Sequence, residues 1–167
     1  IDVVRDAVAS VGLASLADEF AGGDGATFLQ CNRNKRSITL DTSTPEGAAV
    51  MRRLVTSADI VVANMPEPAM KANGLDYDSL RAVKPDIILA SATAFGNGGP
   101  YSDRVGFDGI GQVMSGGVYR SGLPDMPIRS VVPYVDFGTA LTLAIGTMMA
   151  LFHKLKTGEG QQVEAAL

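Results

Sequence analysis

The sequence predicts an α/β fold in which helices flank a parallel sheet. Two short, uninterrupted apolar segments, residues 60–63 (IVVA) and 87–92 (IILASA), are typical of parallel strands that are buried on both faces. Helical patterns alternate with these segments, which indicates βα units. Ligands bind beside the carboxyl ends of such strands, so we expect a site at the loops 64–66 and 93–99.

Local signals predict the elements that precede the first of these strands. They are a segment that begins with helical spacing, a glycine-rich loop and a short strand, over residues 2–20, 21–26 and 37–40. A longer helix begins at Thr44-Pro45-Glu46. The threonine can cap this helix, the proline suits its first turn, and the glutamate favours its positive end.

The second half of the chain contains one long helix among shorter elements. Short helices over 68–72, 77–83 and 109–114, a glycine- and proline-rich loop over 116–133 and a last strand over 162–165 are predicted. The long helix begins at Asp136 and ends near Gly158. Its apolar stretch, residues 137–152, is shorter than the roughly 20 residues that a membrane span needs. We therefore expect a buried core helix and no membrane partner.

Composition limits the possible classes of function. The chain has 167 residues, 46% of them hydrophobic and 19% charged, which suits one globular domain. A net charge of −4 argues against a general affinity for nucleic acid. One cysteine, Cys31, and one histidine, His153, leave no intrachain disulfide, zinc site or Cys–His pair, and they suit a reducing, cytoplasmic compartment. The chain begins at Ile1 rather than Met, so we expect a piece of a longer protein.

Asp136 is the one acid at the start of the long apolar helix, in the segment PYVDFG. It can be a helix cap, which stabilises a helix by about 1 kcal/mol. It can also be a carboxylate nucleophile that the positive end of the helix holds in its ionised form. Both roles use the same placement, and the residue type alone does not separate them.

Two loops are weaker candidates for ligand binding. The cluster NRNKR at residues 32–36 can be a solvated loop or a phosphate-binding group of cations. The segment FGNGGPYSDR at 95–104 can be a simple turn or a place where the backbone approaches a ligand. Gly109-Ile110-Gly111 lacks both a preceding strand and a third glycine, so it does not indicate a dinucleotide site.

The ordered set of segments resembles the family III CoA-transferases, also called the CaiB/BaiF family. That family includes formyl-CoA and carnitine CoA-transferases and α-methylacyl-CoA racemases. The matching segments follow the family order and cover nearly the whole chain. They are CNRNKRSITLDTSTPEG, LVTSADIVVANMPEPAMKANGLDYDSLRAVKPDIILASATAFGNGGPYSDR, GFDGIGQVMSGG, YVDFG and KTGEGQQVEAAL.

The resemblance implies that residues 1–167 form a single partial domain, the central part of a Rossmann-like, CoA-binding large domain. The first strand and the smaller second domain of family members would lie outside it. Family members form interlocked homodimers, so we expect a homodimer for the full-length protein. The 167-residue piece alone lacks the parts that close the interlocked ring, and we expect it to be inactive.

By position, the resemblance assigns Asp136 as the catalytic aspartate. The implied reaction moves CoA from an acyl-CoA to a free carboxylic acid through an acyl-aspartyl anhydride and an aspartyl-CoA thioester. CoA is then a substrate, and neither a permanently bound cofactor nor a metal is required. The residues that the resemblance nominates for contact with CoA are Arg5, Asn32, Arg33, Lys35, Arg36, Asn64, Met65, Phe95, Gly96 and Arg104. The first five of them are candidates for the phosphates of CoA.

Two departures from the family pattern bear on the activity. Met65 stands where the family has phenylalanine beside CoA, which keeps apolar contact but loses ring stacking. Racemase members carry a histidine in a G-H-D segment, and this chain has Gly106-Phe107-Asp108 there. Phenylalanine cannot move a proton, which favours a transferase over the alternative of an acyl-CoA racemase or epimerase. A non-catalytic CoA-binding domain is the other alternative.

Overall fold

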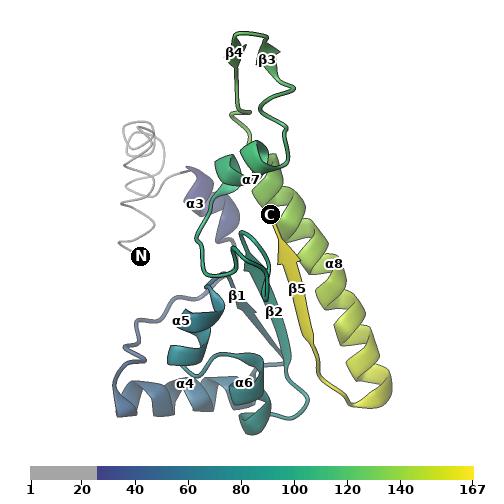
Figure 1. Ribbon diagram of the computed structural model, residues 1–167. Helices are drawn as coiled ribbons and strands as arrows, with labels where there is room; N and C mark the ends of the chain where they lie inside the picture. Colours follow the sequence, from purple (N-terminus) through teal and green to yellow (C-terminus); the bar gives the residue numbers. More distant parts are fainter. Residues whose placement is uncertain (1–25) are drawn as a thin grey trace. The chain divides into compact units, whose positions relative to one another are not determined.

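The computed structural model describes residues 26–167, which belong to two compact units, Ile1–Thr39 and Leu40–Leu167 (Figure 1). The described part of the first unit contains α3 (Ala26–Cys31), followed by a turn. Asn34 in this turn has a φ of 61°, in the left-handed region that asparagine tolerates. The sheet and the candidate site belong to the second unit.

The second unit is built on a three-stranded parallel sheet with the order β1-β2-β5. Its strands are β1 (Ile60–Ala63), β2 (Ile88–Thr93) and β5 (Gln162–Ala166). In register, Val61 of β1 lies beside Leu89 of β2. Because β2 is the central strand, all residues from Ile88 to Ser91 are buried. The predicted α/β class with a parallel sheet is therefore confirmed.

Three helices cover one face of this sheet: α4 (Pro45–Ser57), α5 (Glu67–Ala72) and α6 (Tyr77–Val83). Each contributes one residue to the main apolar cluster, which consists of Val55, Met70, Leu80, Ile87 and Leu89. Local caps fix the starts of two of these helices. The Thr44 hydroxyl accepts a hydrogen bond from the Gly47 N–H, and the Asp76 carboxylate accepts one from the Ser79 N–H.

The long helix α8 (Tyr134–Thr157) packs along the opposite face, against β2 and β5 (Figure 1). Leu143 and Ala150 are buried there, and Gly146 allows close approach to Val163 of β5. Because α8 lies over β2 and β5, the same face of β1 is left uncovered, and Val62 is 71% exposed. Burial of β1 on both faces, which the apolar run predicted, is therefore wrong for this chain.

Most apolar side chains of α8 are exposed in this chain, among them Leu141, Ile145 and Leu155. The expectation of a buried core helix thus holds only for the face that meets the sheet. By length and composition alone α8 is apolar enough to cross a membrane, a property that core helices of globular proteins share.

The segment between β2 and α8 holds a short helix and a hairpin. The helix is α7 (Asp108–Met114), which packs against α8. The hairpin pairs β3 (Gly122–Leu123) with β4 (Met126–Pro127) in antiparallel fashion. This hairpin lies in the stretch that was predicted to be a loop.

Several expected boundaries differ from the structure. Residues 37–40 belong to no strand in the described part of the chain, so the predicted strand there is wrong. The long helix begins at Tyr134, two residues before the expected start at Asp136. It ends as expected before Gly158, which has a left-handed φ of 80°. The predicted helical spacing of residues 2–20 lies outside the described residues.

Ion pairs of Lys154 with Asp59 and Asp86 join the last turns of α8 to the amino ends of β1 and β2. The side chain of Lys154 is only 10% exposed, and its Nζ lies 2.8 Å from Asp86 Oδ2 and 3.0 Å from Asp59 Oδ1. Hydrogen bonds and charge from Lys154 lower the pKa values of both aspartates. Burial by itself would lower the pKa of Lys154, but the two carboxylates together raise it.

Lys154→Met should lower the thermal unfolding midpoint of the protein, by about 2–4 °C at neutral pH. The aspartates are stabilised in their ionised form, so their contribution exists above their ordinary pKa of 3.8 and disappears as the pH falls. The contribution of Lys154 exists below its ordinary pKa of 10.5 and disappears as the pH rises past its raised value. The difference in unfolding midpoint between Lys154→Met and wild type should therefore shrink at both low and high pH. Lys156→Met, an exposed cation of the same turn, is the control; a difference that does not depend on pH would contradict the assignment.

Candidate active site

A cavity of about 920 Å³ lies where α8 leaves β1 uncovered. One wall consists of Val62 of β1 with Ala90 and Ala92 of β2, and the other is a face of α8 that includes Leu143. The loops that follow β1 and β2 close its end. This end of the cavity therefore lies at the carboxyl edge of the sheet, where the predicted topology places ligands.

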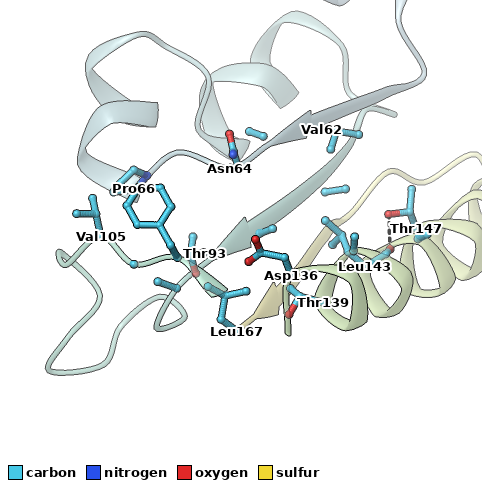
Figure 2. Close-up of a pocket in the computed structure, with 18 of the residues that line it drawn as sticks. Val62, Asn64, Pro66, Thr93, Val105, Asp136, Thr139, Leu143, Thr147 and Leu167 are labelled. Carbon is cyan, nitrogen blue, oxygen red and sulfur yellow. Dashed lines mark hydrogen bonds between the residues drawn. The ribbon is translucent and has the colours of Figure 1, made fainter. Parts of the chain in front are cut away.

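Asp136 lines this cavity from the first turn of α8, and its carboxylate points into the cavity (Figure 2). The residue is exposed, yet the surrounding atoms take part of its carboxylate away from water. This desolvation raises the pKa of Asp136, and the negative charge of Asp108 raises it further. The net effect is opposite to the one expected from the helix end alone.

The cap of α8 is Asp108, at the start of α7. Its Oδ1 accepts hydrogen bonds from the backbone N–H groups of Val135, at 2.9 Å, and Asp136, at 3.2 Å. Pro133, which directly precedes the helix, makes no capping bond with its side chain. Asp136 is thus not the helix cap, and its side chain is not engaged in holding the helix start.

Polar groups from the two loops share the cavity with Asp136. Asn64 follows β1, Thr93 ends β2, and both line the cavity into which the Asp136 carboxylate points (Figure 2). Arg104 also lines the cavity, and its guanidinium lies 4.4 Å from the ring centroid of Tyr101. Such stacking orients an exposed arginine without consuming all of its donors. The arrangement places a carboxylate, a cation and an amide around one largely apolar space.

Comparison with known sequences identifies the group of proteins to which this arrangement belongs. The sequence model of CoA-transferase family III matches residues 6–167. The chain belongs to CoA-transferase family III.

Members of family III similar to this chain include the succinate–glutarate CoA-transferase of Agrobacterium fabrum. That protein is 44% identical, with 85% of this chain and 36% of the relative covered. A formyl-CoA:oxalate CoA-transferase of a Bradyrhizobium species is 34% identical, with 100% of this chain and 39% of the relative covered. The chain thus spans little more than a third of the length of these relatives.

Solved structures agree with the family assignment. A CaiB/BaiF family protein from Brucella suis superposes with a TM-score of 0.80 at 40% identity, covering 87% of this chain and 39% of that chain. The resemblance of the sequence to family III and the predicted fold class are both confirmed.

The structure separates the CoA-contact candidates of the second unit into two groups. Asn64 and Arg104 line the cavity with Asp136. Met65 packs against the apolar cluster on the other face of the sheet and lines a smaller cavity of about 470 Å³. Phe95 packs edge-on against Tyr101, with ring centroids 5.6 Å apart.

Gly96 shapes the loop after β2. Its φ of 71° requires a residue that tolerates the left-handed region, and its N–H donates to Thr93 Oγ1 at 3.0 Å. Its position is therefore explained by the turn itself, and contact of Phe95 or Gly96 with CoA stays a prediction.

The remaining CoA-contact candidates lie in the first unit. Within that unit, Lys35 Nζ donates to Asn32 Oδ1 at 3.2 Å, while Arg33 and Arg36 are exposed. Arg5 lies outside the described residues. Their role toward the phosphates of CoA stays a prediction.

Sequence reasoning missed Asp108 and Gln112 as parts of the site. Asp108 is 6% exposed and Gln112 is 1% exposed. Their spacing of four residues in GFDGIGQ places both polar side chains on one face of a short helix, which was the available signal. In the described range 26–167, no group of three histidine, cysteine or acidic side chains is placed to hold a metal ion.

Proposed function

We propose that the protein containing this chain transfers CoA from an acyl-CoA to a free carboxylic acid, with Asp136 as covalent nucleophile. The carrying observation is the Asp136 carboxylate, free of a capping role and directed into the cavity at the carboxyl edge of the sheet. Membership of family III supports a CoA thioester as substrate.

The reaction proceeds by exchange at carbonyl carbons. The Asp136 carboxylate attacks the thioester carbonyl, and the C–S bond breaks. CoA thiolate departs, and an acyl-aspartyl anhydride remains. The thiolate attacks the aspartyl carbonyl and releases the donor acid, which gives an aspartyl-CoA thioester. The acceptor carboxylate attacks the aspartyl carbonyl of this thioester, its C–S bond breaks, and a second anhydride forms with release of CoA thiolate. CoA thiolate then attacks the acceptor's acyl carbonyl, which restores Asp136.

The local electrostatics suit this role. A carboxylate with a raised pKa is more basic than ordinary aspartate, and greater basicity strengthens a nucleophile of the same type. Arg104 supplies a cation in the same cavity for the anionic acceptor or for CoA, and Asn64 supplies amide donors. The names of the relatives point to dicarboxylic acids as acceptors, so glutarate and oxalate are the first acceptors to test.

Racemase chemistry is the second candidate, and one observation counts against it. Phe107, which stands where racemase members carry histidine, lines the same cavity and is 78% exposed. A phenyl ring at that place cannot exchange a proton with the substrate. A non-catalytic CoA-binding role is the third candidate, and it predicts binding without turnover.

Other parts of the proposal concern the whole protein. The whole protein is a cytoplasmic homodimer of interlocked chains, and CoA is its substrate rather than a resident cofactor. The CoA phosphates contact Arg5, Asn32, Arg33, Lys35 and Arg36. The isolated 167-residue chain does not catalyse CoA exchange, because the rest of the dimer completes the site.

Trapping the covalent intermediate tests the proposal in a protein extended to the length of its relatives. Incubation with succinyl-CoA or formyl-CoA without an acceptor, quenching with hydroxylamine and peptide mass spectrometry should find a hydroxamate on Asp136. Asp125, an exposed acid in the hairpin turn, should stay unmodified. An unmodified Asp136 with α-deuterium uptake from solvent would favour the racemase, and CoA binding with neither result would favour the binding domain.

A further inference from the structure

A buried relay of hydrogen bonds joins α7 to the turn that carries Asp136. Asp108 Oδ1 holds the N–H groups of Val135 and Asp136, and its Oδ2 accepts from Gln112 Nε2. Both side chains are almost fully buried. An ionised acceptor with two backbone donors forms one of the stronger kinds of hydrogen bond in proteins.

Gln112 connects this relay to the segment that leads into α8. Its Oε1 accepts from the backbone N–H of Ser130 at 2.7 Å, and its Nε2 lies 3.4 Å from the carbonyl oxygen of the same residue. The side-chain amide of Gln112 therefore contacts both the N–H and the C=O of Ser130, and its Nε2 also donates to Asp108. Because each partner has one acceptable orientation, the relay fixes the approach to α8 as well as its first turn.

The two helices also pack closely together at Gly111. A Cβ at Gly111 of α7 would lie 2.7 Å from Val135 Cγ1, closer than real side-chain contacts. Gly111 thus lets α7 pack closely against the side chain of Val135, in the turn that bears Asp136. The hydrogen bonds and this contact both act on Val135, the residue directly before Asp136.

We infer that Asp108 is a positioning residue, which holds the first turn of α8 and thereby the Asp136 carboxylate in the cavity, and that Gln112 holds Asp108 in turn. The catalytic part of this inference rests on the proposed function of Asp136. Asp108 itself is buried with both carboxylate oxygens engaged, so it is not the group that attacks the substrate. Among the described residues that line the cavity, the charged side chains are Asp136 and Arg104, so Asp136 is the carboxylate among them.

Asp108→Asn separates this role from a purely structural one. The asparagine Oδ1 can still accept from Val135 and Asp136, so the cap survives. Its Nδ2 would face the donor end of Gln112, and turning the Gln112 amide to relieve this would place a donor against the Ser130 N–H. The negative charge beside Asp136 is lost in either arrangement. Asp108→Ala removes the cap altogether.

The experiment uses the full-length protein, with transfer from succinyl-CoA to glutarate as the assay. Asp108→Asn should lower kcat by about 10- to 100-fold with little change in KM, because a small misplacement of a reacting group costs up to about 100-fold. The acid limb of its pH profile should move to lower pH, since one cause of the raised Asp136 pKa is gone. Asp125→Asn, which removes an equal charge from the hairpin turn, should leave both readouts unchanged.

A second readout does not depend on catalysis. Labelling of Asp136 with a water-soluble carbodiimide and an amine, followed against pH by mass spectrometry, reports the protonation of that carboxyl directly. Its midpoint should fall in Asp108→Asn. If wild type forms no hydroxamate but the labelling midpoint of Asp136 falls in Asp108→Asn, the placement by Asp108 stands and the proposed function fails. Wild-type kcat and an unmoved midpoint in Asp108→Asn would overturn the inference, whatever Asp108→Ala does to folding.

Discussion

Asp136→Asn should abolish CoA transfer by the full-length protein, with a loss of about 10⁴-fold or more, as is found when a covalent nucleophile is removed. Asparagine has the same shape as aspartate, but its amide cannot form the acyl anhydride. The measurement is the initial rate of thioester exchange between succinyl-CoA and glutarate. Residual exchange within tenfold of wild type would exclude Asp136 as the nucleophile.

The stability of the same variant shows whether the loss is functional. The pKa of Asp136 is raised in the folded chain, so the ionised form destabilises the fold once the pH exceeds the ordinary value of 3.8. Asparagine removes this penalty at neutral pH. The gain should be a few tenths of a kcal/mol at most, because solvent screens an exposed carboxylate. Loss of activity with an unchanged or slightly higher unfolding midpoint would therefore identify a catalytic residue.

The elements that the sequence predicted well carry their signals locally. The apolar run of β1 and the Thr44-Pro45-Glu46 start of α4 are contained within a few residues, and both were placed correctly. The start of α8 was misplaced because its cap, Asp108, lies 28 residues before Asp136. A pattern within PYVDFG contains no trace of that partner.

Properties that depend on neighbours were less predictable. The apolar run of β1 indicates a strand, but the exposure of Val62 depends on where α8 lies across the sheet. The segment 37–40 has strand-like residues, yet a strand exists only where another strand offers hydrogen bonds. Asp136 was singled out as a candidate from its place at the start of the helix and assigned by the family pattern, whereas its raised pKa depends on burial and on the position of Asp108 in three dimensions.

Gly160→Ala should destabilise the protein by about 3 kcal/mol, a large effect for the addition of one methyl group. A Cβ at Gly160 would overlap the carbonyl oxygen of Ile87 and lie 2.7 Å from that of Asp86. Both neighbours are backbone atoms at the start of β2, so no rotamer change relieves the clash. The expected result is a lower midpoint in urea, with an unchanged slope if the unfolded state is unaffected.

Alanine substitutions at two other glycines serve as controls for the loss of stability in Gly160→Ala. Gly158 has open space around its Cβ position but a left-handed φ of 80°, so Gly158→Ala should cost about 1 kcal/mol through the backbone alone. Gly99 has open space and no such φ, and Gly99→Ala should be nearly neutral. A Gly160→Ala midpoint equal to that of Gly99→Ala would contradict the close approach of the two strands.

The consequence of Gly160→Ala extends to the site, because β5 supports α8 along its length. The Gln161 carbonyl accepts from the Leu89 N–H at 3.1 Å at the start of the strand pair, and Val163 packs against Gly146. At the far end, Thr139 Oγ1 lies 3.4 Å from the carbonyl oxygen of Ala166, one turn from Asp136. A displaced β5 therefore shifts the surface against which the turn that carries Asp136 packs. Any folded Gly160→Ala protein should lose kcat at temperatures well below its unfolding midpoint, whereas Gly158→Ala should keep it.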